Sequence, residues 1–375
     1  MKSREVLFVS KPVVAPFDDG TKCIVRDLAA ATTGLEVGVL SVPGADAISD
    51  RVSMHGVYRA AGSYTPGLAE NLRAFAWLAT RSRACLWHFV FAPNPKTSRA
   101  AALLRALRRV PTVQTVASRP RSFDEPESIL FGDVVVAQSN DTRRRILEGY
   151  ERAKVPSSRR RRVEVIPPPL GPVRIPTLDD TDRVRAELAV GPDVPLLLFP
   201  GDLEAGNAAR WVGDSVQHVV ARHREAVVVF AYRSKSPASA DVAERLKSSL
   251  SPTRTRFVCD APDMLALLRT SAVVLFPVDD LYGKVDLPIV LLESMALGTP
   301  VIALDSGPLS DLEGVERLRE GNPELLATTA LALVDDYGRR TRRIEAQSRA
   351  VAERHDASRV AGAYQDIYLE LLHRR

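Results

Sequence analysis

One acidic side chain interrupts the apolar run that follows Pro288. Pro288 near the start of this run and Gly298 just past its end predict a short helix, because proline gives up an amide that would be orphaned there and glycine accepts a left-handed exit. The free amides at the start of such a helix attract a phosphate group. Glu293 is the one charge on the predicted helix. A buried carboxylate is costly unless it is hydrogen-bonded, so either a backbone amide or hydroxyl satisfies Glu293 or the diol of a ligand does.

The run DLPIVLLESMALGTPVIA, residues 286–303, carries a resemblance to a known family. It is similar to the donor-binding signature of the retaining GT-B glycosyltransferases, in the large family that includes the sucrose synthases and the phosphatidylinositol mannosyltransferases. In that family the second Glu of a Glu-x7-Glu pair holds the ribose of a nucleotide sugar, and Glu293 matches this second Glu. Val285 stands where the first Glu would be, between Lys284 and Asp286.

The resemblance implies a binding site for the donor's diphosphate. The backbone amides that follow Pro288, beginning at Ile289, would contact the phosphates, and Lys284 and Arg233 would neutralise their charge. Relatives supply that charge with an Arg and a Lys after the first strand of the second domain, where Gly201 is here followed by an acidic residue. Ordinary surface charge is the alternative for Lys284 and Arg233.

Three further residues complete the predicted site. Gly20 opens a helix after the first strand, so its amide can approach an oxyanion closely. The resemblance places this loop at the reacting centre, and a plain helix cap by Asp19 is the alternative. Asp260 has the position that holds the nucleobase edge in the family, unless it caps the helix that follows. Asp286 could touch the hydroxyls of the sugar.

Neither a catalytic histidine nor a metal site is expected. His88 lies inside an apolar run, where a histidine satisfied within the core is more common than a catalyst. Asp279 and Asp280 are adjacent but lack the His or third carboxylate that a tight site needs. GT-B relatives usually work without a bound metal. We therefore expect no cofactor besides the nucleoside-diphosphate sugar that serves as donor substrate.

Charge is divided unevenly along the chain. Residues 1–175 carry 27 Lys and Arg against 16 Asp and Glu, whereas residues 176–375 carry 24 against 30. A basic first half suits an anionic acceptor, because Arg binds phosphate-like groups bidentately; a solvated rim is the alternative. The strand-end loops of this half hold Asn94, Lys96, Ser118, Arg119, Arg121, Ser139 and Asn140. Nucleic acid is not an expected partner, because no aromatic-rich basic strand or zinc spacing accompanies the charge.

The stretch from Ser98 to Val110 predicts a basic amphipathic helix. It sets Leu103, Leu104 and Leu107 on one side and Arg99, Arg105, Arg108 and Arg109 on the other. Such a helix could lie on an anionic membrane, but we favour a helix that covers the sheet and turns a solvated face outward. No apolar run is long enough to span a membrane, and the first residues pass directly into a strand, so we expect a cytoplasmic protein.

Strand-like and helix-like segments alternate through both halves of the chain. This alternation predicts parallel sheets with helices on both faces and ligands at the carboxyl ends of the strands. The predicted strands are 6–10, 35–42, 86–91, 112–116, 134–137, 163–166, 196–199, 226–230, 256–259, 272–276 and 301–304, and the predicted helices are 21–31, 68–80, 98–109, 142–150, 179–188 and most of 323–375. Five prolines in residues 167–176 predict the hinge between domains.

These observations and the resemblance predict a GT-B fold, with two Rossmann-like, doubly wound domains facing across a cleft. Residues 1–170 would form the acceptor-side domain, residues 171–355 the nucleotide-sugar domain, and residues 356–375 a helix that packs back on the first domain. The implied activity is transfer of a sugar from a nucleoside diphosphate to an acceptor with retention of anomeric configuration. Because the usual Arg, Lys and first Glu are absent, a non-catalytic nucleotide- or partner-binding relative is an alternative, as is a nucleotide-sugar epimerase or hydrolase.

Overall fold

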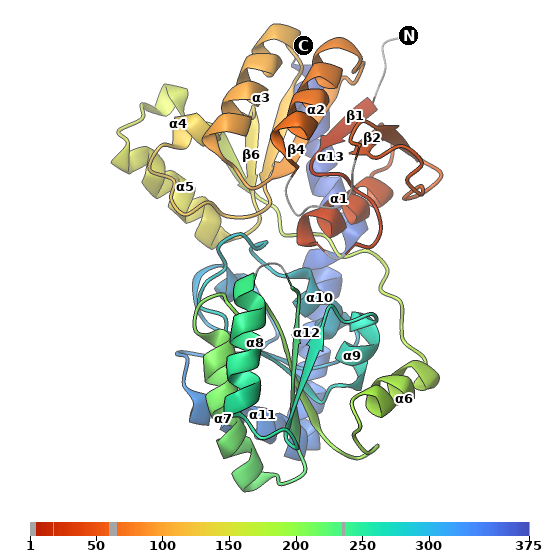
Figure 1. Ribbon diagram of the computed structural model, residues 1–375. Coiled ribbons are helices and arrows are strands. Elements are labelled where there is room, and N and C mark those ends of the chain that lie inside the picture. The colour runs from red at the N-terminus through yellow and green to blue at the C-terminus, as the bar shows by residue number, and fades with distance from the viewer. Residues whose placement is uncertain (1–4, 18, 60–65, 235–236, 375) are drawn as a thin grey trace. The chain divides into compact units, whose positions relative to one another are not determined.

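The computed structural model describes residues 5–17, 19–59, 66–234 and 237–374, and the chain divides into two compact units. Unit 1 comprises Met1–Gly171, Tyr282–Ile289 and Arg354–Arg375, and unit 2 comprises Pro172–Leu281 and Val290–Glu353. In each unit, helices cover both faces of a parallel sheet (Figure 1). The prediction of two doubly wound α/β domains is confirmed.

Within its described residues, unit 1 holds a parallel sheet of seven strands in the order β3-β2-β1-β4-β5-β6-β7. The direction of winding reverses between β1 and β4, where ligands of such sheets bind. The strands are β1 (Glu5–Val9), β2 (Glu36–Ser41), β3 (Val52–Gly56), β4 (Leu86–Phe91), β5 (Thr112–Val116), β6 (Val134–Ala137) and β7 (Arg162–Val165). The helices are α1 (Gly20–Ala31), α2 (Leu68–Thr80), α3 (Pro95–Arg108), α4 (Pro126–Ile129), α5 (Asn140–Arg152) and α13 (Ala357–His373).

The sheet of unit 2 has six strands in its described residues, in the order β10-β9-β8-β11-β12-β13, and its winding reverses between β8 and β11. The strands are β8 (Leu196–Pro200), β9 (Val227–Tyr232), β10 (Thr255–Cys259), β11 (Val273–Phe276), β12 (Val301–Leu304) and β13 (Glu316–Leu318). The helices are α6 (Leu178–Glu187), α7 (Ala208–Arg222), α8 (Pro237–Ser249), α9 (Met264–Thr270), α10 (Ile289–Ala296), α11 (Pro323–Asp335) and α12 (Tyr337–Ala350).

Two strands, β3 and β13, escape the sequence prediction, and each lies at an edge of its sheet. β3 contains Ser53 and His55, and the three-residue β13 begins with Glu316. An edge strand is open to solvent along one side, so it needs no continuous apolar run. The strands that the sequence predicts lie mostly inside the sheets, where both faces are buried.

The last helix returns to unit 1, as predicted. α13 packs against α1, and Gln365 donates a hydrogen bond to the carbonyl of Thr33. A parallel bridge joins Leu170 to Asp356 just before α13, and the Nδ1 atom of His355 lies 2.9 Å from the carbonyl oxygen of Pro168.

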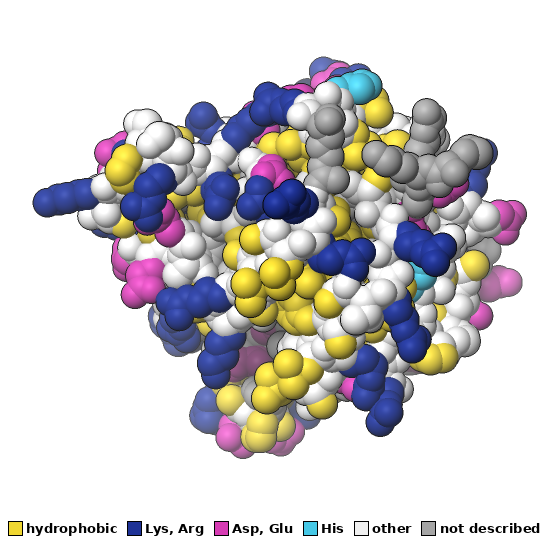
Figure 2. Space-filling view, turned by 90° about the horizontal axis from the view of Figure 1, so that it is seen from above, with side chains coloured by type: hydrophobic (Ala, Val, Ile, Leu, Met, Phe, Trp, Pro, Cys, Tyr) yellow, Lys and Arg dark blue, Asp and Glu magenta, His cyan; other side chains and the backbone are white. Residues whose placement is uncertain are grey.

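Figure 2 looks onto the end of unit 1 at which α2 and α3 lie in Figure 1. Hydrophobic side chains gather in the middle of this view, and Lys and Arg side chains are spread around them. This distribution agrees with the basic composition of residues 1–175. It also shows that apolar side chains are not confined to the interior.

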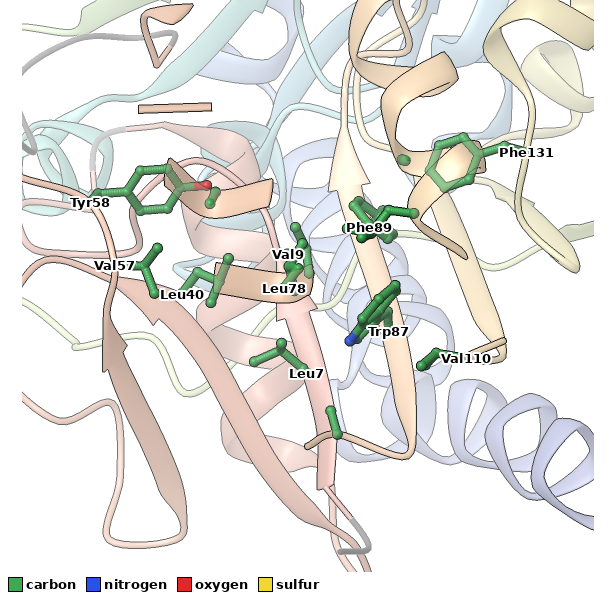
Figure 3. Close-up of a cluster of buried hydrophobic side chains, with 14 residues drawn as sticks. Leu7, Val9, Leu40, Val57, Tyr58, Leu78, Trp87, Phe89, Val110 and Phe131 are labelled. Atoms are coloured by element: carbon green, nitrogen blue, oxygen red, sulfur yellow. The ribbon is translucent and has the colours of Figure 1, made fainter. Parts of the chain in front are cut away.

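A hydrophobic cluster joins the inner faces of α2 and α3 to the sheet (Figure 3). Trp87 and Phe89 of β4 and Leu7 of β1 pack with Leu78 of α2 and Leu104 of α3. The Trp87 indole donates to a serine hydroxyl at 3.1 Å, so its one polar atom is satisfied.

The expected orientation of α3 is wrong for two of its three leucines. Leu104 is buried, but Leu103 and Leu107 are 64% and 72% exposed. The buried face of α3 is completed by Ser98 and Ala101. These small side chains let the helix lie close to the sheet, so the leucines beside them turn outward.

Candidate functional site

Gly20 begins α1 at the carboxyl end of β1. Asp19 caps this helix, and its side chain accepts hydrogen bonds from the amides of Thr21 at 2.9 Å and Lys22 at 3.4 Å. Burial alone would raise the pKa of Asp19, but the Lys11 ammonium at 2.9 Å and the amide bonds together hold it below its usual range. The cap by Asp19, which was the alternative interpretation, is therefore present.

Val285 explains why position 20 is a glycine. A Cβ atom at Gly20 would lie 2.9 Å from Cγ1 and 3.0 Å from Cγ2 of Val285, closer than such atoms normally approach. Val285 is 6% exposed. Val285 stands at the position of the first Glu in the family that this chain resembles, and here it makes an apolar contact with the first turn of α1.

Asp286 is 1% exposed and is held by the next loop along the sheet. Ser139, which follows β6 and caps α5, donates its hydroxyl to Oδ2 of Asp286 at 2.6 Å. No hydrogen-bond partner for Oδ1 lies among the described residues. Burial raises the pKa of Asp286 to about 6, although the hydroxyls of Ser139 and Thr142 and the charge of Arg119 act in the opposite direction.

A second carboxylate in this region is ionised by its arginine partners. Asp141 pairs with Arg119 at 2.8 Å, Arg144 at 2.5 Å and Arg145 at 2.8 Å. Burial would raise the pKa of Asp141, but these hydrogen bonds and charges lower it. Asp141 therefore stays charged, and its charge adds to the cost of ionising Asp286.

The segment Tyr282–Ile289 thus belongs to unit 1, where it contacts loops from the carboxyl ends of β1, β5 and β6. At its start, the Arg121 guanidinium lies 4.3 Å from the centre of the Tyr282 ring, a cation–π contact. Lys284 is half-buried, and Pro288 and Ile289 are buried where the segment enters α10. Sequence reasoning found the residues of this segment but not their contacts with Gly20, Arg121 and Ser139.

Glu293 lies in α10 among buried apolar side chains. Leu291, Leu292 and Met295 are fully buried, whereas Glu293 is half-buried. The predicted helix stop is confirmed: Gly298 has a left-handed φ of +75°, and the amide of Thr299 donates back into the helix at 2.9 Å. The short strand predicted after it is β12.

Gly201 and Arg233 follow neighbouring strands of unit 2, β8 and β9. A Cβ atom at Gly201 would lie 2.6 Å from the ring of Phe199, so close packing against the strand requires glycine there. The guanidinium of Arg233 lies 3.9 Å from Asp202, the acidic residue that replaces the arginine of the resembling family. The cation proposed to bind phosphate thus has a carboxylate close by.

Asp260 does not cap the helix that follows it. Asp263 is the cap of α9, since its side chain accepts from the amide of Ala266 at 3.0 Å. Asp260 is exposed, has a left-handed φ of +49°, and accepts a long bond of 3.4 Å from the amide of Ser234. Asp260 directly follows β10. Its recognition of a nucleobase stays a prediction.

Sequence reasoning missed the contact that Asp279 makes at the switch point of unit 2. Its carboxylate accepts from the amide of Asn207 at 2.9 Å and from the side chain of Asn207 at 2.8 Å, just before α7. Gly206, with a φ of +62°, leaves room for the carboxylate. In the sequence, the Gly206-Asn207 pair before a helix is the feature that could have indicated this contact. The carboxylate of Asp279 therefore holds the residue that immediately precedes α7.

His88 is a core histidine, as expected. It is fully buried, and burial lowers its pKa to about 3. Among the described residues, no group of three or more His, Cys, Asp or Glu side chains is gathered as a metal site. Nor does any helix in the described ranges have the length and apolar character needed to cross a bilayer.

Comparisons with known proteins identify the class of fold. Three solved structures cover nearly the whole chain: sucrose-phosphate synthase from Thermosynechococcus elongatus (TM-score 0.71, 17% identity, 99% of this chain and 100% of that one), a glycosyltransferase from Rickettsia africae ESF-5 (0.70, 16%, 99% and 99%), and HepE from Anabaena in complex with UDP and glucose (0.68, 14%, 98% and 99%). The chain has the GT-B fold, and this prediction is confirmed.

Part of the chain is also similar in sequence to one protein family. Residues 194–336, which include α10, match the family model described as Glycosyl transferases group 1. No curated protein sequence matches the chain.

Proposed function

We propose that this chain transfers a sugar from a nucleoside diphosphate to an acceptor with retention of anomeric configuration. The observation that carries the proposal is the match of residues 194–336 to a glycosyltransferase family, within a chain whose whole length has the GT-B fold. The structure of HepE contains UDP and, in a second complex, UDP-glucose. A UDP-sugar is therefore the first donor to test.

Glu293 is proposed to hold the ribose of the donor. It is the one charged residue of α10 and is half-buried, and a partly desolvated setting strengthens a hydrogen bond that a carboxylate accepts from a diol. The amides after Pro288, beginning with that of Ile289, are proposed to stabilise the diphosphate together with Lys284 and Arg233. A departing diphosphate needs such fixed positive groups.

Gly20 and Asp286 are proposed to shape the reacting centre. Gly20 keeps the first turn of α1 free of a side chain, and its contact with Val285 fixes the loop that precedes α10. Asp286 is held by Ser139 and is almost fully buried, so its proposed part is to position this loop. A direct contact between Asp286 and a sugar hydroxyl remains a prediction.

The test begins with donor binding. UDP affinity is measured by calorimetry for the wild type, for Glu293→Ala and for the control Glu324→Ala, an exposed carboxylate of α11. Loss of a charged hydrogen bond should weaken binding by about tenfold or more in Glu293→Ala alone. Equal affinities would remove Glu293 from the site. Binding of GDP, TDP or ADP in place of UDP would change the donor without changing the role of Glu293.

Turnover separates the proposal from its alternatives. UDP release from UDP-sugars is followed with and without a panel of acceptors, and the anomeric configuration of any product is read by NMR. Release that depends on an acceptor supports transfer, and release without one supports a hydrolase or epimerase. Binding without release under every condition supports a non-catalytic relative, which the apolar Val285 and the Arg233–Asp202 pair favour.

A further inference from the structure

The outer side of α2 is apolar. Its exposed positions are Leu68, Ala69, Leu72, Ala76 and Thr80, and none of them is charged. Leu68 and Leu72 are 76% and 60% exposed. Because they are four residues apart, both leucines lie on the same side of the helix. A surface helix normally turns its polar residues to this side.

The neighbouring helix repeats the pattern. Leu103 and Leu107 of α3 are four residues apart and exposed, and Ala100 and Ala106 are exposed beside them. α2 and α3 lie side by side, since Arg108 at the end of α3 donates to the carbonyl of Ser82 just past α2 at 2.8 Å. We call Leu68, Leu72, Leu103 and Leu107 the leucine face. α2 and α3, which carry it, are labelled in Figure 1.

Positive charge surrounds the leucine face. Lys96 and Arg99 are exposed at the start of α3, and Arg109 is exposed at its end. Among the described residues, no carboxylate pairs with any of these three. Across α2 and α3, whose residues are all described, Glu70 is the one acidic side chain, and Arg73 neutralises it at 2.7 Å.

A basic cavity of about 460 Å³ opens beside the last turn of α3. Its charged lining residues are Arg105, Arg109, Arg162, Arg374 and Asp133. Asp133 pairs with Arg105, and Glu370 pairs with Arg162 and Arg374. The charge of Arg109 is therefore left to attract an anion such as a phosphate.

We propose that the leucine face docks on the surface of a bilayer that contains anionic lipids. The four leucines enter the acyl region, and the lysine and arginines bind head-group phosphates. The positive charges around the leucine face favour an anionic lipid surface over a second copy of the chain. A second copy of the chain would bring the same unpaired cations together at a two-fold contact, and like charges repel. An anionic lipid surface supplies apolar chains and negative charge together.

Sedimentation with vesicles tests the proposal on the full chain. The wild type should bind vesicles of phosphatidylcholine and phosphatidylglycerol in equal parts and not vesicles of phosphatidylcholine alone. Leu103→Ser with Leu107→Ser should lower the partition coefficient by at least about tenfold, because burial of each leucine is lost. The matched control is Leu178→Ser, which changes a leucine that is 82% exposed on α6 of unit 2 and should leave binding unchanged.

A second pair of variants tests the charges. Arg99→Gln and Arg109→Gln should each weaken binding to the anionic vesicles about fivefold, and added salt should weaken it further. Equal binding to both kinds of vesicle, or no effect of the leucine changes, would overturn the proposal. So would an absence of vesicle binding together with a dimer in ultracentrifugation that the leucine variant abolishes, since the occupant would then be a second copy.

Discussion

Unit 1 is completed by two segments that return to it from elsewhere in the chain, and they are held in different ways. At its buried contact with the sheet, α13 is held by neutral polar groups that satisfy one another. Tyr282–Ile289 is held by a buried acid with one oxygen left without a partner among the described residues. We call these two contacts the α13 joint and the Tyr282–Ile289 joint. The first suits a contact whose stability is independent of pH, and the second suits a contact whose stability changes with pH.

His88 is the centre of the α13 joint. Its ring nitrogens lie 2.7 Å from the hydroxyls of Tyr368 and Thr115, and Thr115 in turn lies 2.9 Å from the hydroxyl of Tyr364. A neutral imidazole donates through one nitrogen and accepts through the other, and hydroxyls can take either role. Burial holds the pKa of His88 near 3, so this cluster carries no charge at ordinary pH.

Asp286 is the centre of the other joint, and its pKa near 6 makes that joint titratable. The groups that face it are the hydroxyls of Ser139 and Thr142, the positive charge of Arg119 and the negative charge of Asp141. Its remaining oxygen could accept a further hydrogen bond. The difference teaches that the fully hydrogen-bonded cluster around His88 stays neutral, whereas the acid with an oxygen left without a described partner is the group that titrates.

The largest expected effect is at the α13 joint. Tyr368→Ala removes a fully buried ring and the partner of His88, and should destabilise the protein by about 3–5 kcal/mol in urea unfolding. Tyr368→Phe keeps the ring but orphans one nitrogen of His88, and should cost about 1–3 kcal/mol. Neither cost should vary between pH 6 and pH 8, because His88 is neutral throughout. A pH-dependent cost would contradict the comparison.

The next effect is the pH dependence of Asp286→Asn. The pKa of Asp286 is about 6 in the folded protein and 3.8 ordinarily. Its ionisation therefore leaves the free energy of unfolding unchanged below about pH 4 and lowers it as the pH rises from 4 through 6. The neutral variant escapes this loss. From pH 4 to pH 8, the stability of the variant should therefore rise by about 3 kcal/mol relative to that of the wild type.

Urea unfolding at a series of pH values measures this change. Asp214→Asn, which alters an exposed carboxylate of α7, is the control and should show little relative change. Parallel pH curves for the wild type and Asp286→Asn would show that Asp286 is not the titrating group.

The smallest effect concerns the contact between Gly20 and Val285. Gly20→Ala forces the valine to move and should cost about 1–2 kcal/mol. Val285→Ala should cost less in the Gly20→Ala background than in the wild type, because it makes room for the new methyl group. A double-mutant cycle on unfolding free energies measures this coupling. Additive effects would mean that the two positions do not compete for space.

Much of the fold was predictable because a buried strand is a continuous apolar run that can be recognised in the sequence. The run at β12 and the stop at Gly298 follow from apolar character and from the left-handed freedom of glycine, and both are present. β3 and β13 were not predictable in this way, because edge strands lack a continuous apolar run. For the site, the sequence identified Glu293, Gly20 and Asp286 as candidates but not what touches them.

The sequence by itself determined the alternation of strands and helices, the division into two α/β units and the resemblance of residues 286–303, because each depends on residues close together in the chain. Only the tertiary structure decided that Val285 packs on Gly20, that Ser139 holds Asp286 and that Leu103 and Leu107 face outward. Those facts depend on which surfaces meet when distant segments pack. Local propensity carries no information about that choice.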